Sequence, residues 1–388
     1  MSYEKPFAGL KVIDLSQGVA GPYAAMLLGQ YGANVIKVEP IEGDWSRTLG
    51  TRYGDQTAYS VVGNVGKRSI ALDLKAEEGR TVLWRLVQGA DVFIQGFRPG
   101  VIDRLGFGYD AVAAREEKII YLSVSGFGPV GPLAERPAMD PVLQAYTGLT
   151  MENAGLDGIP HRVPIVSIDM STALYSYGAI ATALFARIRE PKGRHIEASL
   201  LQAAAGLQGI RMMASYLEGG ATRAVVPPRG VWPTRDGWIN ITVVRPWEWS
   251  AFCIAMNLPE EPRFATNEGR LAHAPELRET VARAFAASGK AELSERFTAQ
   301  RVMHEQLNTY VSFLEQEHTR VAEVVRWVQH PGVERAIPLP NVIGAELFSE
   351  HAVAPALGQH GADILCEHGY AEDAIEAMRT RGVLGGQS

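Results

Sequence analysis

Residues 11–39 read KVIDLSQGVAGPYAAMLLGQYGANVIKVE, and this stretch indicates the fold class. A short apolar run at 11–16 leads into a glycine-containing turn at 17–22. Residues 23–32 then place apolar side chains at helical spacing and end on a glycine, and residues 34–39 form a second apolar run. A strand, a helix and a strand in this order make a βαβ unit, which normally joins two parallel strands by a right-handed crossover.

The same alternation continues along the chain. RSIALDL (68–74) and DVFIQGF (91–97) read as strands on either side of a helical segment at 76–90. A further helical segment at 108–117 leads into KIIYLSVSGF (118–127). The sequence therefore predicts an α/β protein with a Rossmann-like, doubly wound parallel sheet, whose ligands bind outside the carboxyl ends of the strands.

The middle of the chain has a different composition. Two prolines within VVPPRGVWP (225–233) precede an aromatic hairpin at 231–243, with Asp236-Gly237 as its tight turn. Charged helical segments follow to about residue 325. We expect a smaller α+β domain at 201–329, and a large domain made of 1–200 together with 330–388, because the last helical segment has no core of its own.

Composition limits the class of partner. The chain has 388 residues, 46% of them apolar, and carries 37 basic and 43 acidic residues for a net charge of −6. An acidic balance argues against nucleic acid or an anionic membrane as the main partner, but allows a small anion held by a few arginines. The cysteines, Cys253 and Cys366, have neither disulfide-framework nor zinc-ligand spacing.

The N-terminus, MSYEKPFAGLKVIDLS, has no basic segment followed by an apolar one, so no signal peptide is expected. No apolar run reaches the ~18 residues that a membrane-spanning helix needs. A cytoplasmic location is therefore the expectation.

The turn at 17–22 reads QGVAGP, and its glycines and proline suit a tight turn with free N–H groups that face a phosphate. The G-x-G-x-x-G fingerprint is absent, so a nicotinamide or flavin cofactor is not favoured. Glu39, at the end of the second strand, fits either a ribose contact or a plain strand end.

Basic residues gather where strands and short helices end. Their guanidinium and ammonium groups fit a polyphosphate ligand, although each one alone also fits an ordinary surface charge. The residues are Lys67, Arg68, Lys75, Arg98 and Arg104. The histidines show no H-E-x-x-H or similar spacing, and SVSGFG lacks the first glycine of a G-x-S-x-G motif. No metal is expected, and carboxylates remain as the candidate nucleophiles or bases.

Asp169 is the only charge in VPIVSIDMSTAL (163–174), directly ahead of a helical segment. One interpretation is an N-cap, the commonest role of such an aspartate, worth roughly 1 kcal/mol. The other is a nucleophile that the helix N-terminus keeps ionised while apolar neighbours remove its water. The two roles are compatible. Asp140, in RPAMDPVLQA (136–145), is a second acid ahead of a helix, and is either another cap or a hydrogen-bond partner for the site.

Together these segments resemble the class III CoA-transferase (CaiB/BaiF) family, which includes formyl-CoA and carnitine CoA-transferases. The likeness covers most of the first 205 residues and returns in three short segments later. The matching segments are 9–40, GKRSIALDL (66–74), GFRPGVIDRLGFGYD (96–110), SVSGFGPVGP (123–132), DPVLQAYTGL (140–149), 168–188, PTRDGWINI (233–241), EPRFATNEGR (261–270) and RTRGVL (379–384).

The resemblance implies a homodimer of interlinked, ring-shaped monomers, with CoA or acyl-CoA bound on the large domain as a substrate and no tightly bound cofactor. The basic cluster, including Lys67 and Arg68, then serves a ligand with several phosphates. The positions that would contact CoA are Val19, Ala20, Leu72, Lys75, Gly96, Phe97, Arg98 and Arg104, with 137–140, including Met139, beside it.

The catalytic aspartate of the family falls on Asp169. Its carboxylate would attack an acyl-CoA to give a mixed anhydride and then an aspartyl-CoA thioester, and an acceptor acid would reverse both steps. Amides near Val19 and Ala20 would stabilise the oxyanions. The resemblance thus implies an enzyme that moves CoA between carboxylic acids.

Departures from the family pattern bear on the alternatives. TRAVVPPRGVW (222–232) has one glycine where members that use formate and oxalate have a glycine-rich loop, which argues against those substrates. Met139 stands where the related racemases carry a histidine, so one acid/base group for proton exchange at an α-carbon is missing. An acyl-CoA racemase or epimerase is therefore the second hypothesis, after the transferase. A CoA-binding protein without turnover is the third. Arg245 fits either a substrate carboxylate or a surface role, and the donor and acceptor acids are not readable from the sequence.

Overall fold

The structure is a computed structural model, and it describes all residues except 1–4, 155–157, 221–225, 350–351 and 387–388. The chain forms two compact units, one built from residues up to Ile210 and from Glu323 onward, the other from Arg211–Ala322. The predicted boundaries differ from these. Residues 201–210 and 323–329 belong to the larger unit, because α9 (Leu200–Leu207) packs into its core and β12 (Val325–Val328) pairs with β13 (Ile337–Pro340).

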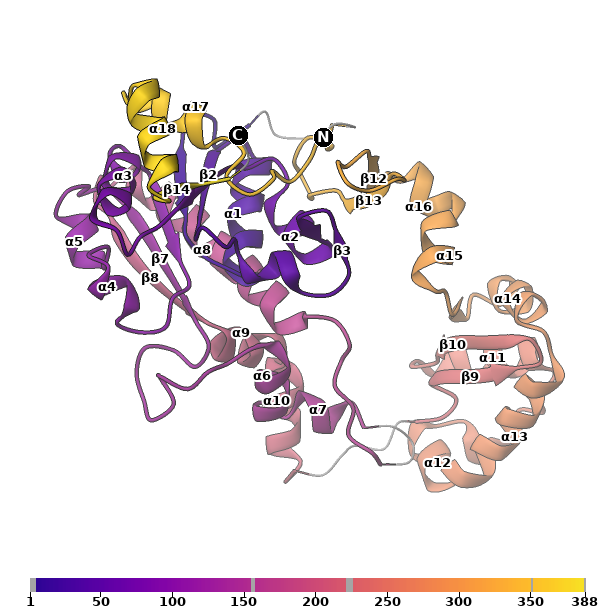
Figure 1. Cartoon of the computed structure of the whole chain (residues 1–388). Coiled ribbons are helices and arrows are strands. Elements are labelled where there is room, and N and C mark those ends of the chain that lie inside the picture. Colours follow the sequence, from indigo (N-terminus) through magenta and orange to yellow (C-terminus); the bar gives the residue numbers. More distant parts are fainter. Residues whose placement is uncertain (1–4, 155–157, 221–225, 350–351, 387–388) are drawn as a thin grey trace. The chain divides into compact units, whose positions relative to one another are not determined.

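A seven-stranded sheet forms the centre of the larger unit, in the order β14-β5-β2-β1-β6-β7-β8 (Figure 1). Its strands are β1 (Lys11–Asp14), β2 (Asn34–Glu39), β5 (Arg68–Leu72), β6 (Val92–Gln95), β7 (Ile120–Ser125), β8 (Arg194–Ser199) and β14 (Leu384–Gly385). All neighbours are parallel except β14 with β5. Numbered along the chain, the parallel strands follow the doubly wound order 3-2-1-4-5-6, whose switch point lies between β1 and β6. The predicted α/β class with a parallel sheet is confirmed.

Both faces of the sheet are covered by helices, because alternate strand residues point to opposite sides. Ile13 and Ile36 belong to one buried cluster, and their neighbours Val12 and Val35 belong to the other. The first cluster packs against α3 (Glu77–Val87), α4 (Val101–Arg104), α5 (Tyr109–Ala113), α17 (Gly361–Glu367) and α18 (Glu372–Thr380). The second packs against α1 (Ala20–Gln30), α6 (Asp140–Tyr146), α8 (Ser167–Arg187) and α9.

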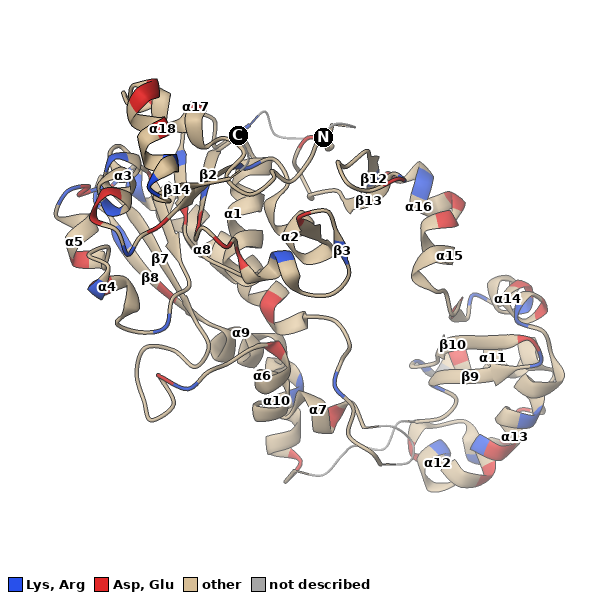
Figure 2. Cartoon of the chain, in the orientation of Figure 1, with Lys and Arg blue, Asp and Glu red and all other residues tan. Residues whose placement is uncertain are grey.

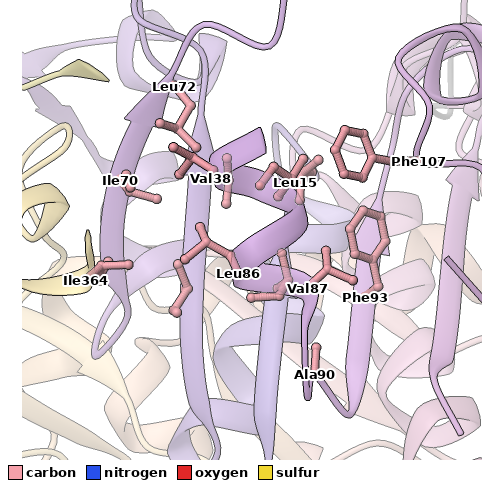
Figure 3. Close-up of a cluster of buried hydrophobic side chains, with 14 of the residues drawn as sticks. Leu15, Val38, Ile70, Leu72, Leu86, Val87, Ala90, Phe93, Phe107 and Ile364 are labelled. Atoms are coloured by element: carbon pink, nitrogen blue, oxygen red, sulfur yellow. The ribbon is translucent and has the colours of Figure 1, made fainter. Parts of the chain in front are cut away.

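The end of the chain returns to this sheet. Leu384 of β14 pairs with Leu72 of β5, and Ile364 of α17 lies in the same buried cluster as Ile70. Figure 3 shows that cluster, with Leu86 and Val87 of α3 directed at the strand residues. The final helices close one face of the sheet, where they bury their apolar sides.

Short elements complete the larger unit. They are η1 (Trp45–Thr48), β3 (Arg52–Tyr53), β4 (Gln56–Thr57), α2 (Ala58–Asn64) and α7 (Leu149–Glu152). A third cluster joins Val61 of α2 and Val65 just after it to Met26 of α1 and Val328 of β12. Through it, the chain around α2 is fixed against the helix that follows β1.

The division between the units falls within α10 (Gly209–Leu217). The smaller unit holds a three-stranded antiparallel sheet and helices around an aromatic core that includes Trp249, Phe252 and Phe285. Its elements are β9 (Gly230–Thr234), β10 (Gly237–Thr242), α11 (Pro246–Met256), η2 (Pro262–Phe264), α12 (Asn267–Ala272), α13 (Ala274–Ala287), α14 (Lys290–Ala299), β11 (Met303–Gln306), α15 (Tyr310–Glu315) and α16 (Glu317–Val321). The hairpin turn is one residue earlier than predicted, because Gly237 already pairs with Thr234.

Charges of both signs are interspersed over the chain in the view of Figure 2. Cys253 is buried and Cys366 is exposed, and both are free. Among the described residues, no helix combines the length and the apolar character needed to cross a bilayer.

Candidate active site

A cavity of about 680 Å³ opens in the larger unit at the carboxyl ends of β1 and β6. Its walls come from the turn after β1, the loop after β6, the segment before α6 and the start of α8. A doubly wound sheet places ligands at this switch point, because the chain diverges there to opposite faces. Of the predicted site residues, the cavity lining includes Val19, Ala20, Gly96, Phe97, Arg98, Met139 and Asp169.

Two of the predicted basic residues form ion pairs within the protein and do not line the cavity. The Lys67 ammonium is buried and donates to Asp14 Oδ2 (2.7 Å), to the Pro22 carbonyl (2.8 Å) and to Asn64 Oδ1 (3.0 Å). Arg68 begins β5, at the sheet edge opposite to the cavity, and pairs with Glu367 through bonds of 2.8 and 2.7 Å. The predicted contacts of Lys67 and Arg68 with a polyphosphate are therefore wrong.

Of the two roles left open for Glu39, the structure excludes the ribose contact. Its carboxylate is buried and accepts hydrogen bonds from both Arg47 Nε (2.7 Å) and Nη2 (2.8 Å) and from Ser69 Oγ (2.8 Å). Burial raises the pKa of Glu39, but Arg47 outweighs it and holds the pKa below its usual value. Glu39 is part of a buried ion pair beneath the turn and has no free oxygen for a ligand.

Other predicted contacts lie beyond the cavity. Leu72 is buried in the core at the end of β5, whereas Lys75 and Arg104 are exposed and lie outside the cavity lining. Arg98, which lines the cavity, is exposed as well. Lys75 follows the carboxyl end of β5, so it lies at the same edge of the sheet as the cavity, and contact with a long ligand stays a prediction for it and for Arg104.

Asp169 is the third residue of α8, inside the first helical turn. The helix begins at Ser167, and the N-cap position is Val166, which provides no side-chain hydrogen bond. The interpretation of Asp169 as an N-cap is therefore wrong. Within the described part of the chain, nothing donates a hydrogen bond to its half-buried carboxylate, which lines the cavity.

The capping role belongs to Asp140, from another helix. Asp140 Oδ2 accepts hydrogen bonds from the backbone N–H groups of Ile168 (2.7 Å) and Asp169 (3.2 Å). Its other oxygen accepts from Gln144 Nε2 at 2.6 Å. Asp140 is the first residue of α6 and caps α8 from 28 positions away in sequence. A buried carboxylate thus fixes the backbone that carries Asp169.

Gln144, which the sequence analysis missed, completes this support. Its amide donates to the Val163 carbonyl (3.1 Å) and accepts from the Val163 N–H (2.9 Å). The segment that leads into α8 is therefore tied to α6. The only signal in the sequence is the four-residue spacing from Asp140, which places both side chains on one helix face.

The electrostatics of Asp169 are unusual for an aspartate. Burial, and secondly the charge of Asp140, raise its pKa to about 7. At neutral pH the carboxylate is therefore ionised in roughly half of the molecules and poorly solvated. A carboxylate in this state, without hydrogen-bond donors, is a better nucleophile than one in water.

The cavity lining includes a residue that sequence reasoning missed. Trp45, in η1, lines the cavity with 41% of its surface exposed, and its ring packs on Gly18. No pattern in the sequence around it signals a ligand contact. Among the described residues, no cluster of His, Cys, Asp or Glu is arranged to hold a metal ion.

Two predictions concern residues elsewhere. Arg245 is exposed in the smaller unit, where it precedes α11, so its contact with a substrate carboxylate stays a prediction. The stretch 222–232, used above to argue against formate and oxalate, lies partly outside the described residues, because 221–225 are among those not described.

Comparison with known proteins identifies the family of this chain. The family model "CoA-transferase family III" matches residues 7–361, and the chain therefore belongs to this family of enzymes. Succinyl-CoA:glutarate CoA-transferase of Mus musculus is 31% identical over 98% of this chain and 90% of its own length. Acetyl-CoA:oxalate CoA-transferase of Acetobacter aceti is 37% identical over 72% of this chain and 75% of its own length.

A crystal structure of a CaiB/BaiF family protein from Brucella suis is similar in fold. It superposes with a TM-score of 0.83 and 29% identity, and the match covers 94% of this chain and all of the other. CoA-transferases use CoA thioesters as substrates. The predicted family, and the prediction that the chain is a family III CoA-transferase enzyme, are confirmed.

Proposed function

We propose that this enzyme moves CoA from an acyl-CoA donor to a carboxylic acid acceptor through covalent intermediates on Asp169. The observation that supports this most is the Asp169 carboxylate itself. It is half-buried, has a raised pKa, and faces a cavity at the switch point of the sheet. A carboxylate with these properties has no evident structural purpose, because Asp140 already caps the helix.

The chemistry divides into two half-reactions. An Asp169 oxygen attacks the acyl-CoA carbonyl carbon, a C–O bond forms and the C–S bond breaks, which leaves a mixed anhydride and CoA thiolate. The thiolate then attacks the γ-carbon of Asp169 and expels the donor acid as a carboxylate. The acceptor carboxylate repeats both steps in reverse and restores Asp169. No proton is gained or lost, so the site needs no general acid or base.

The first turn of α1 supplies the oxyanion contacts. Val19 and Ala20 line the cavity, and no described group accepts a hydrogen bond from their backbone N–H groups. Free amides at a helix N-terminus favour a negative oxygen. We place the thioester carbonyl between these amides and Asp169, and the phosphates of CoA outward beside Arg98.

A racemase or epimerase is less well supported. Such an enzyme exchanges a proton at the α-carbon and needs an acid/base group on each side of it. Met139, which lines the cavity, has no titratable group, and the Asp140 carboxylate is committed to the amides of α8. Incubation of an acyl-CoA in heavy water without an acceptor acid distinguishes the reactions, because only a racemase puts deuterium at the α-carbon.

The names of the relatives suggest where a substrate screen begins. We propose succinyl-CoA and acetyl-CoA as donors and glutarate as the first acceptor, with oxalate as the comparison acid that the sequence argues against. Transfer measured by chromatography of the CoA products, with Asp169→Ala as the matched inactive variant, tests the proposal. Wild-type transfer that persists in Asp169→Ala rejects it, and binding of CoA without transfer by any pair favours a binding protein.

We also propose the interlinked homodimer that the family resemblance implies. Exposed apolar side chains on the packed helices α8 and α9, and just beyond them, support a second copy. They are Leu174, Tyr175, Phe185, Ile188, Leu207 and Ile210. Interlinked chains predict that two differently tagged preparations exchange no subunits unless they are unfolded. A cytoplasmic location stays a prediction.

A further inference from the structure

Four buried charged side chains hold the turn between β1 and α1 in place. Asp14, Lys37, Asp44 and Lys67 are between 0% and 3% exposed, and they come from β1, β2, the start of η1 and the chain before β5. We call these residues the buried quartet. Their charges balance, two positive against two negative, and each of them bonds to the turn at 16–22 or to another member.

Lys37 and Asp44 hold the first half of the turn. Lys37 Nζ donates to the Ser16 carbonyl and to Asp44 Oδ2 (3.1 Å). The Asp44 carboxylate accepts from the Gly18 N–H at 3.0 Å and 3.2 Å. Gly18 has φ +82, and a Cβ there would collide with the Trp45 ring, so this position of the turn requires glycine.

Lys67 and Asp14 hold the second half. Lys67 Nζ donates to the Pro22 carbonyl (2.8 Å) and to Asp14 Oδ2 (2.7 Å). Asp14 in turn accepts from the Ser16 N–H (3.0 Å) and from the Ser16 hydroxyl. The backbone is thus anchored on both sides of Val19 and Ala20. Both residues line the cavity, and no described group accepts a hydrogen bond from their amides.

We propose that the buried quartet is a positioning device for catalysis, which fixes the Val19 and Ala20 amides at the place where the acyl oxygen becomes negative. This inference rests on the proposed function. Four buried charges are a costly way to stabilise a fold, because apolar residues of similar volume are often equally good. They do fix the direction of each backbone group, and oxyanion stabilisation depends on that direction.

The quartet gives the reaction a distinctive pH dependence. Lys67 faces Asp14, Lys37, Asp44 and Asn64. Burial, with the charge of Lys37, lowers its pKa to about 8 against the opposing effect of Asp14. Above that pH, Lys67 loses a proton and one of its three hydrogen bonds, so turnover falls as pH rises through about 8.

The experiment compares Lys67→Met with the wild-type enzyme and with Lys118→Met, which removes an exposed lysine remote from the cavity. The probe is the donor–acceptor pair that the wild-type enzyme turns over, and free CoA for binding. We expect kcat to fall at least about tenfold in Lys67→Met. The upper bound is the ~100-fold to ~1000-fold known for complete loss of an oxyanion donor, because Lys67→Met displaces the amides without removing them. We expect KM and the CoA dissociation constant within about threefold of wild type, and no alkaline decline.

A second variant guards against misfolding. Lys67→Met/Asp14→Asn removes one charge of each sign, which preserves the balance of the buried quartet while it frees the Pro22 carbonyl. The proposal is overturned if either folded variant keeps both the wild-type kcat and the decline of kcat at alkaline pH. A change in KM without a change in kcat overturns it as well. It is also overturned if neither variant folds, because the quartet then serves stability alone. Absence of transfer by the wild-type enzyme rejects the proposed function and is seen before any variant is made.

Discussion

The pKa of Asp169 makes stability a direct probe of the carboxylate. Its pKa rises from 3.8 to about 7 on folding, because burial and Asp140 disfavour the charged form. A shift of about three units corresponds to about 4 kcal/mol, and water at the half-buried carboxylate reduces this to ~2 kcal/mol. Ionised Asp169 therefore destabilises the folded chain. The penalty begins as pH rises above 3.8 and is complete above about 7.

Asp169→Asn removes that penalty. We expect the variant to be more stable than wild type by ~2 kcal/mol at pH 8, and by less than half of that at pH 5, where wild-type Asp169 is protonated in the folded state. Urea unfolding followed by circular dichroism at several pH values gives the difference. Asp373→Asn, which replaces an exposed carboxylate in the first turn of α18, is the control. A difference that does not change with pH, or a less stable Asp169→Asn, would refute the reasoning.

Three more outcomes follow from the same contacts. The rate of covalent labelling of Asp169 by an acyl-CoA should fall about tenfold per pH unit below pH 7, and rapid-quench mass spectrometry measures it. Asp140→Asn removes a charge that raises the pKa of Asp169, so the fall in labelling rate should begin at a lower pH in this variant. A fall that begins at the same pH as in wild type would contradict the effect of Asp140 on Asp169. Arg47→Met leaves the buried Glu39 carboxylate without its arginine partner and should lower the unfolding free energy by ~3 kcal/mol in urea titrations. Arg47→Met/Glu39→Gln should recover part of that stability, because the unpaired charge is gone.

The sheet and the position of the cavity were predictable from the sequence. Alternating apolar runs define β1, α1 and β2, and parallel strands of this order bring their carboxyl ends together. The isolated charge at 169 was also readable, because an acid in an apolar stretch needs a reason. These features depend on local patterns that the fold preserves.

The partners of buried charges were not predictable. Lys67 looks like a free strand-end cation in sequence, but Asp14, its partner, lies 53 residues earlier. Asp140 likewise caps a helix 28 positions away, so local reasoning assigned that role to Asp169. Hydrogen bonds between distant segments form only when the sheet and helices are assembled, and no short sequence window contains both groups.

Covalent attachment at Asp169 is the central claim, and peptide mass spectrometry after trapping tests it most directly. The wild-type enzyme is incubated with an acyl-CoA that it turns over, quenched with hydroxylamine or borohydride, and digested. If Asp169 is the nucleophile, the peptide that contains it carries a hydroxamate or a reduced side chain, and Asp169→Ala carries neither. An unmodified Asp169 in an enzyme that transfers CoA, or the same modification on another carboxylate, would contradict the proposal.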